Sequence, residues 1–264
     1  MTHSLNFDID YMTDFLVGLL KIPSPTGMAG EAVAYTAGAL KAFPVEQKIT
    51  NKGTLVANWA GQADSAPRAL TAHVDTLGAM VKDVKPNGRL KLTKIGGFHW
   101  NTVEGEGCFI FSSGGRRLRG SLLLYKASSH IHGGEVGDTK RDDETMEVRL
   151  DERASSAAET RALGVEVGDF VAFDPRVEVS DSGFVRSRHL DDKAAVACIL
   201  GAMKAIHDAG LKPAQRATIH ISNYEEVGHG AAAGFPPDLV ELLSVDMAAV
   251  GIGQASDEFS ACIC

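Results

Sequence analysis

The sequence predicts an α/β protein whose main domain is assembled from the two ends of the chain, with a β-rich domain inserted between them. Helix and strand patterns alternate at both ends of the chain. Residues from about 80 to 180 instead read as short strands between Gly-rich turns. We therefore place the α/β domain at residues 1–76 and 177–264, and the inserted β-rich domain at residues 77–176.

The first part of the α/β domain contains helices followed by strands. Residues 10–43 have helical patterns on both sides of a turn that is rich in Pro and Gly. Residues 54–61 read as a short apolar strand. A second apolar strand, within residues 68–81, runs directly into His73 and Asp75. These two polar side chains therefore stand at the end of a predicted strand.

The middle of the chain has little helical periodicity. Short strands are expected within residues 90–97, 108–126, 145–152 and 170–180. The second of these ranges contains the turn SSGG and resembles a hairpin. Residues 155–164 have a helical pattern. This part of the chain is therefore expected to be a β-rich unit.

The α/β pattern resumes in the last part of the chain. Residues 189–210 predict a helix, because apolar side chains such as Ile199 and Met203 recur at helical spacing. Residues 216–226 read as a strand that ends in two carboxylates. Residues 239–252 are expected to form a short helix that leads into another buried strand.

The composition predicts a globular protein that binds neither nucleic acid nor membranes. Hydrophobic residues make up 44% and charged residues 23% of the chain, which excludes disordered, collagen-like and coiled-coil proteins. The net charge of −8 gives no general attraction to polyanions. No apolar run approaches the roughly 18 residues that a membrane span needs, and the N-terminus does not resemble a signal peptide. We therefore expect a cytoplasmic location.

Polar residues with catalytic potential recur where elements begin or end. They are His73 and Asp75 at a strand end, Asp191 at a helix start, Glu225 and Glu226 at another strand end, and Asp246 near the start of a strand. Ligands of open α/β sheets bind outside the carboxyl ends of strands, so these side chains can meet in one site. Each also has an ordinary explanation, as a turn residue, a helix cap or a solvated surface pair.

A histidine with several carboxylates and no cysteine suits Zn, Co or Mn. One carboxylate between two cations is the pattern of a two-metal hydrolase. Asp75 lies two residues from His73 on an extended chain, so it can hold the second ring nitrogen of that histidine. Adjacent glutamates at a turn suit a divided task, with one on a metal and the other on the attacking water.

Four segments resemble the successive metal-site motifs of the M42 family of aminopeptidases: TAHVDTLGAMV, RHLDDKAA, NYEEVGHGAAA and SVDMAAVG. The resemblance implies a central mixed sheet flanked by helices, of the zinc-peptidase type, with an inserted dimerisation domain. It implies His73, Asp191, Glu226 and Asp246 as ligands of two divalent metal ions, with Asp191 bridging them. It further implies that Asp75 orients His73.

The resemblance also implies a reaction. Glu225 would be the general base that activates water in the hydrolysis of N-terminal residues from peptides or dipeptide-like substrates. The family implies a homo-oligomer, from a dimer to a dodecamer. Three further segments, HVDTLGAMVK, GGFHWNTVEGEG and SRHLDDKA, resemble a branch linked to an acetylglutaminylglutamine amide osmolyte, which favours a dipeptide-like substrate.

Two alternatives remain open at this point. The family has a further histidine ligand downstream of the position of Asp246, and the sequence ends at Cys264 before reaching it. We therefore expect a truncated chain with an incomplete second metal site, which could retain only the fold and the assembly surface. The other alternative is a metal-dependent amidase or deacylase of N-acylated amino acids or dipeptides, because a dinuclear site does not dictate which amide is cut.

Overall fold

A five-stranded mixed sheet forms the centre of the α/β part of the protein. The computed structural model describes residues 5–263. The strands lie in the order β1 (Val45–Ile49), β2 (Leu55–Trp59), β12 (Gln215–Ser222), β3 (Ala63–His73) and β13 (Glu241–Ser244). Strands β12 and β13 run parallel to β3, whereas β12 pairs with β2 in the antiparallel sense. The predicted α/β fold with a central mixed sheet is therefore confirmed.

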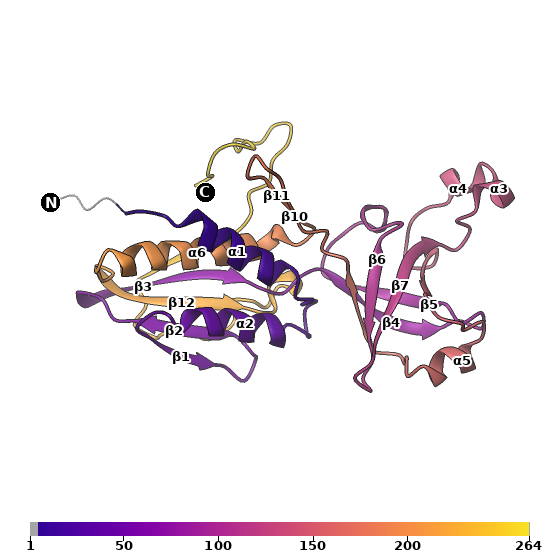
Figure 1. Cartoon of the computed structure of the whole chain (residues 1–264), viewed down its shortest axis with the longest axis horizontal. Coiled ribbons are helices and arrows are strands. Elements are labelled where there is room, and N and C mark those ends of the chain that lie inside the picture. The colour runs from indigo at the N-terminus through magenta and orange to yellow at the C-terminus, as the bar shows by residue number, and fades with distance from the viewer. Residues whose placement is uncertain (1–4, 264) are drawn as a thin grey trace.

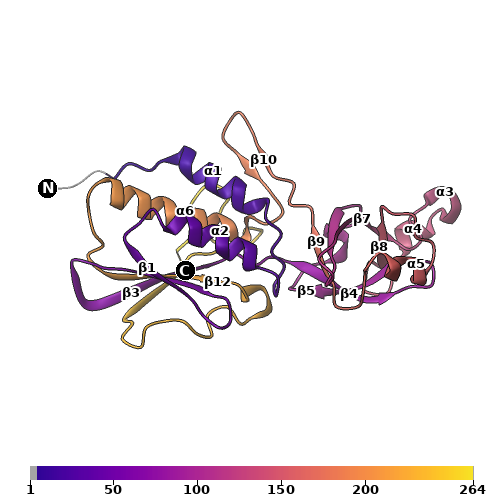
Figure 2. The ribbon, with the colours of Figure 1, turned by 60° about the horizontal axis from the view of Figure 1, so that its bottom comes forward.

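Three helices pack against this sheet: α1 (Ile9–Leu20), α2 (Gly30–Leu40) and α6 (Leu190–Asp208). Helices α1 and α6 lie side by side in both views of the molecule (Figures 1 and 2). Their fully buried side chains, including Leu19 and Leu200, form one hydrophobic core with β2, β3 and β12. Within residues 5–263, no helix has the length and apolar character needed to cross a membrane.

A closed six-stranded barrel forms the second part of the molecule (Figure 1). Its strands, in order around the barrel, are β4 (Gly78–Val84), β5 (Leu90–Ile95), β8 (Met146–Leu150), β7 (Arg117–Leu124), β6 (Gly107–Phe111) and β9 (Phe170–Phe173). Strands β6 and β7 form the predicted hairpin. Alternate side chains of β7, including Leu122, fill the barrel interior, as expected for strands with one buried face.

Short elements connect the barrel strands and lead back to the sheet. They are the 3-10 helix η1 (Trp100–Thr102), the helices α3 (Ser129–His132), α4 (Glu135–Asp138) and α5 (Ala157–Ala162), and the two-stranded hairpin β10 (Glu178–Val179) and β11 (Val185–Arg186). Helix α5 lies within the predicted helical range. The barrel strands span residues 78–173, and the domain limits at 76/77 and 176/177 stay predictions.

One buried carboxylate ties the barrel to the segment that precedes α6. The carboxylate of Glu106, which precedes β6, pairs with Arg176 at 2.7 Å and also with Arg188. The Arg188 guanidinium further donates to the carbonyl oxygen of Thr102 at 2.8 Å. These contacts hold the returning chain against the barrel just before it reaches Asp191.

The expectation for residues 239–252 is wrong. The segment contains no helix, and its strand β13 is exposed at all four positions. Strand β13 pairs with β3 at the end of the sheet order, so it has no second neighbour among the described strands. Asp246 consequently follows the end of a strand and is exposed, whereas we expected it near the start of a buried one. The apolar side chains suggested a buried strand, but β13 lies at the edge of the sheet, where its side chains are exposed.

Candidate metal and active site

A cavity of about 230 Å³ opens where three parallel strands end. Strand β3 ends at His73, β12 at Ser222 and β13 at Ser244, and all three of these residues line the cavity. Glu225 and Asp246 also line it. The carboxyl edge of a parallel arrangement is where open α/β sheets bind ligands. The structure therefore brings together side chains from distant parts of the sequence, as expected.

The His73 imidazole is buried, with 2% of its side chain exposed. Its Nδ1 lies 2.9 Å from the backbone oxygen of Asp75 and 3.4 Å from that residue's Oδ1. Because the backbone oxygen can only accept, Nδ1 carries a proton, and in the neutral ring the lone pair is on Nε2. That Nε2 has no hydrogen-bond partner among residues 5–263, although Asp191 Oδ1 lies 3.2 Å and Glu225 Oε2 3.5 Å away.

The field around His73 favours a positive charge. Burial lowers the pKa of His73, but the carboxylates of Asp191 and Asp75 outweigh burial and raise it to about 11. A divalent cation on Nε2 would satisfy the same carboxylates. A buried nitrogen without a partner, aimed between carboxylate oxygens, therefore fits a metal ligand.

Asp75 is fully buried and accepts several hydrogen bonds. Its Oδ2 accepts from the Thr26 hydroxyl at 2.6 Å and from the Glu226 amide at 3.3 Å, and its Oδ1 accepts from the Glu225 amide at 3.2 Å. Burial raises the pKa of Asp75, but hydrogen bonds from His73 and Thr26 outweigh it and keep the pKa below its usual value. Asp75 thus links His73 to both glutamates, and the sequence pattern did not reveal its contacts with Thr26 or with the glutamate amides.

The two glutamates lie on a single turn of 3-10 helix, η2 (Glu225–Val227), directly after β12. Glu226 Oε1 accepts a hydrogen bond from the Leu77 amide at 3.1 Å, whereas the Glu225 side chain is 49% exposed at the cavity. Burial, with the nearby charge of Asp191, raises the pKa of Glu226 to about 7. Burial also raises the pKa of Glu225. The turn gives the two neighbouring carboxylates different surroundings, as a divided task requires.

Asp192 is a site residue that the sequence pattern did not reveal, because an aspartate at a helix start commonly serves as a cap. One ligand atom each from His73, Asp192 and Asp246 lies within 4.8 Å of the others. Asp192 is buried, and its Oδ2 accepts from the backbone amide of His73 at 3.1 Å, a contact outside its own helix. Burial and the charge of Asp246 raise the pKa of Asp192 to about 8. The side chain of the neighbouring Asp191 is 46% exposed. Its Oδ1 lies near the Nε2 atom of the His73 ring, whereas Asp192 contacts the His73 backbone.

The donor set of the cavity consists of one imidazole and several carboxylates. Zinc, cobalt and manganese accept nitrogen and oxygen ligands of this kind. Carboxylates that are crowded together and raised in pKa need a neutralising charge, which a divalent cation supplies. The residues present therefore fit a divalent metal ion.

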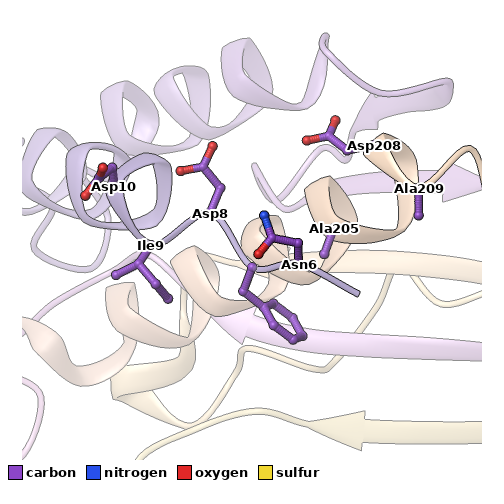
Figure 3. Close-up of a pocket in the computed structure, with 8 residues that line it drawn as sticks. Asn6, Asp8, Ile9, Asp10, Ala205, Asp208 and Ala209 are labelled. Atoms are coloured by element: carbon purple, nitrogen blue, oxygen red, sulfur yellow. The ribbon is translucent and has the colours of Figure 1, made fainter. Parts of the chain in front are cut away.

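A second hollow, of about 590 Å³, lies between the N-terminal segment and the end of α6 (Figure 3). Its walls include Asp8, Asp10 and Asp208, together with backbone and apolar groups. Two of these carboxylates, those of Asp8 and Asp208, pair with Lys204. Because Ala205 is 14 residues beyond Asp191, about 20 Å along a helix, this hollow is separate from the cavity at His73.

An acidic, histidine-containing cavity at the strand ends of a mixed sheet is suited to an enzyme that works with divalent metal ions. The sequence matches the model of the M42 glutamyl aminopeptidase family over residues 53–264. The chain belongs to this family of metal-dependent aminopeptidase enzymes.

Similar proteins agree with this assignment. The chain is 47% identical over 246 residues to the putative aminopeptidase YhfE of Bacillus subtilis. The alignment covers 93% of this chain and 71% of that protein. The fold resembles an aminopeptidase from Desulfurococcus kamchatkensis, with a TM-score of 0.81, 21% identity and coverage of 95% of this chain and 66% of that one. It also resembles the TET1 peptidase of Pyrococcus horikoshii, with a TM-score of 0.68, 22% identity and coverage of 82% and 62%. The chain thus spans about two thirds of the length of these proteins.

Proposed function

We propose that the protein is a dinuclear metal-dependent aminopeptidase whose active site is the cavity at His73. The observation that carries the proposal is the buried, unpartnered Nε2 of His73 among carboxylates, in a chain of the M42 family. His73, Asp191 and Asp246 would hold one divalent ion, and Asp191 and Glu226 would hold the second. Asp192 joins this set because it lies within ligand distance of His73 and Asp246. Zinc or cobalt, and also manganese, suit these donors.

Glu225 and Asp75 have separate roles in the proposed reaction. When bound, the metal ions would lower the pKa of water and polarise the scissile carbonyl. Glu225, exposed at the cavity, accepts a proton from the attacking water and later returns it to the leaving amine. Its pKa, raised by burial, brings it closer to neutrality, where a general base is most effective. Asp75 holds the His73 ring and the backbone of Glu225 in place.

The substrate we propose is a peptide with a free N-terminus, or a dipeptide-like molecule. We further propose a homo-oligomer, between a dimer and a dodecamer, in which residues 77–176 act as the dimerisation domain. Support comes from the TET1 peptidase of Pyrococcus horikoshii, which can assemble into a tetrahedron or a large octahedral shell. A cytoplasmic location is part of the same proposal.

The function is tested with a pair of chromogenic substrates. A leucine or glutamate p-nitroanilide with a free amine should be hydrolysed after addition of zinc or cobalt, and its N-acetylated form should not. Hydrolysis of the acetylated form alone would instead support the amidase or deacylase. Absence of turnover of either substrate, with the metal bound, would support a chain that retains only the fold and the assembly surface.

Metal binding should stabilise the folded chain. Zinc at about 100 times its Kd should add roughly 2.7 kcal/mol to the free energy of unfolding, because only the folded state presents the assembled ligands. Thermal unfolding with zinc, and after addition of EDTA, measures this effect. The variants Asp191→Asn and Asp192→Asn compare the two neighbouring carboxylates, and Asp83→Asn on the exposed side of β4 is the control. Equal zinc stabilisation in all three variants would contradict the proposed ligand set.

A further inference from the structure

The segment that joins α1 to α2, residues 22–28, lies directly against the strand end that carries the proposed site. We call this segment the α1–α2 connector. The Thr76 amide donates to Ser24 O at 2.9 Å, and the Thr26 amide donates to Thr76 O at 3.3 Å. The Ser24 hydroxyl donates to Val74 O at 2.7 Å. Ser24, Thr26 and Thr76 are all buried. The connector is thus attached on both sides of Asp75.

The connector has little freedom to move. Pro23 and Pro25 restrict its backbone φ angles. The ammonium of Lys193, which is fully buried, donates to Leu19 O at 3.1 Å and to Ile22 O at 2.7 Å. Because Lys193 directly follows the two aspartates at the start of α6, the same helix start holds both the connector and the site carboxylates.

The Thr26 hydroxyl is the group through which the connector reaches the site. It donates to Asp75 Oδ2 at 2.6 Å, the shortest of the hydrogen bonds that the Asp75 carboxylate accepts. With Oδ2 held by Thr26, the other oxygen, Oδ1, faces His73 Nδ1 and accepts from the Glu225 amide. The hydroxyl therefore contributes the shortest of the three hydrogen bonds that fix the orientation of the buried carboxylate.

We propose that Thr26 is a positioning residue of the active site, acting through Asp75 on both the His73 imidazole and the backbone of the glutamate pair. This inference rests on the proposed function. Without the hydroxyl, the Asp75 carboxylate keeps only the longer hydrogen bonds from the Glu225 and Glu226 amides, so the His73 ring and the turn at Glu225 are held less firmly. Thr26 is not among the residues that line the cavity, so we assign it a positioning role and no direct contact with the reacting groups.

Three variants test this role. Thr26→Val removes the hydroxyl and keeps the shape, whereas Thr26→Ser keeps the hydroxyl. Thr36→Val is the matched control, because Thr36 is also fully buried and its hydroxyl donates to Ala32 O at 2.9 Å within α2, away from the site. The first measurement is hydrogen exchange of the Glu225 and Glu226 amides in the metal-free chain. We expect faster exchange of both amides in Thr26→Val, and wild-type exchange in the other two variants.

The second measurement is zinc affinity, by competition with a chromophoric chelator, together with kcat and KM for the aminoacyl p-nitroanilide. Loss of a group that supports a ligand typically costs 10–100-fold, so zinc affinity or kcat of Thr26→Val should fall by about tenfold with KM little changed. Thr26→Ser should recover most of this loss.

The outcomes distinguish a failure of the proposed function from a failure of the role of Thr26. A wild-type chain that neither binds zinc nor cleaves the substrate overturns the proposed function. A wild-type chain that does both, with unchanged amide exchange, zinc affinity and kcat in Thr26→Val, overturns the role of Thr26 alone. An equal loss in Thr36→Val or in Thr26→Ser also overturns it, since the effect would then not come from the hydroxyl.

Discussion

Glu225→Gln should reduce kcat by about 10²–10⁴-fold while the chain stays folded and binds zinc normally. Glutamine has nearly the same shape as glutamate but cannot accept the proton of the attacking water. The Glu225 side chain is half exposed, so its replacement should change the free energy of unfolding little. Steady-state kinetics, metal analysis and thermal unfolding of the same preparation measure the three quantities.

Glu46→Gln is the control for this substitution, because Glu46 lies exposed on β1, on the far side of β2 and β12 from His73 in the sheet order. It should leave kcat, zinc content and Tm as in the wild type. If Glu225→Gln kept more than about a tenth of the wild-type kcat, proton transfer would have to be assigned to another group. Loss of zinc together with activity would instead indicate that Glu225 is a ligand.

Asp75→Ala should cause the largest loss of stability of any single change at the site. It removes the acceptor of the Thr26 hydroxyl and of the Glu225 and Glu226 amides at once. An unsatisfied buried donor costs about 1–3 kcal/mol, so we expect the free energy of unfolding to fall by about 3–5 kcal/mol. Urea denaturation of the metal-free chain measures this change without any contribution from metal binding.

Asp75→Asn and Asp83→Ala complete this experiment. Asparagine keeps one acceptor oxygen in place and should give an intermediate loss. Asp83 is exposed on β4, and its replacement should change the free energy of unfolding by no more than about 0.5 kcal/mol. A loss in Asp75→Ala as small as that of Asp83→Ala would mean that the hydrogen bonds to Asp75 do not hold the loops together.

Periodicity was sufficient to predict most of the fold. The long apolar strand that ends at His73 and the helix that begins beside Asp191 carry patterns set by local spacing, so the α/β organisation and the hairpin of the barrel followed from sequence. Residues 239–252 did not, because only Glu241–Ser244 form a strand, at the edge of the sheet, and the apolar residues after it are in neither helix nor strand and are mostly exposed. Whether an apolar strand is covered depends on its neighbours in the sheet, and local sequence does not contain that information.

The candidate site was predictable to a similar extent. Parallel strand ends explain why His73, Glu225 and Asp246 line one cavity. Asp192 and Thr26 were not predicted as site residues, because their roles depend on contacts with segments far away in the chain, at His73 and Asp75. An aspartate at a helix start and a threonine in a Pro-rich turn have common local roles that hide such contacts.

The barrel leaves the sheet just after Asp75 and returns to it just before Asp191, with Glu106 holding Arg176 and Arg188 on the return path. Both junctions therefore adjoin side chains that flank the same imidazole. The orientation of the barrel relative to the sheet is therefore set within a few residues of the proposed site, at Asp75 on the outgoing strand and at Asp191 on the return.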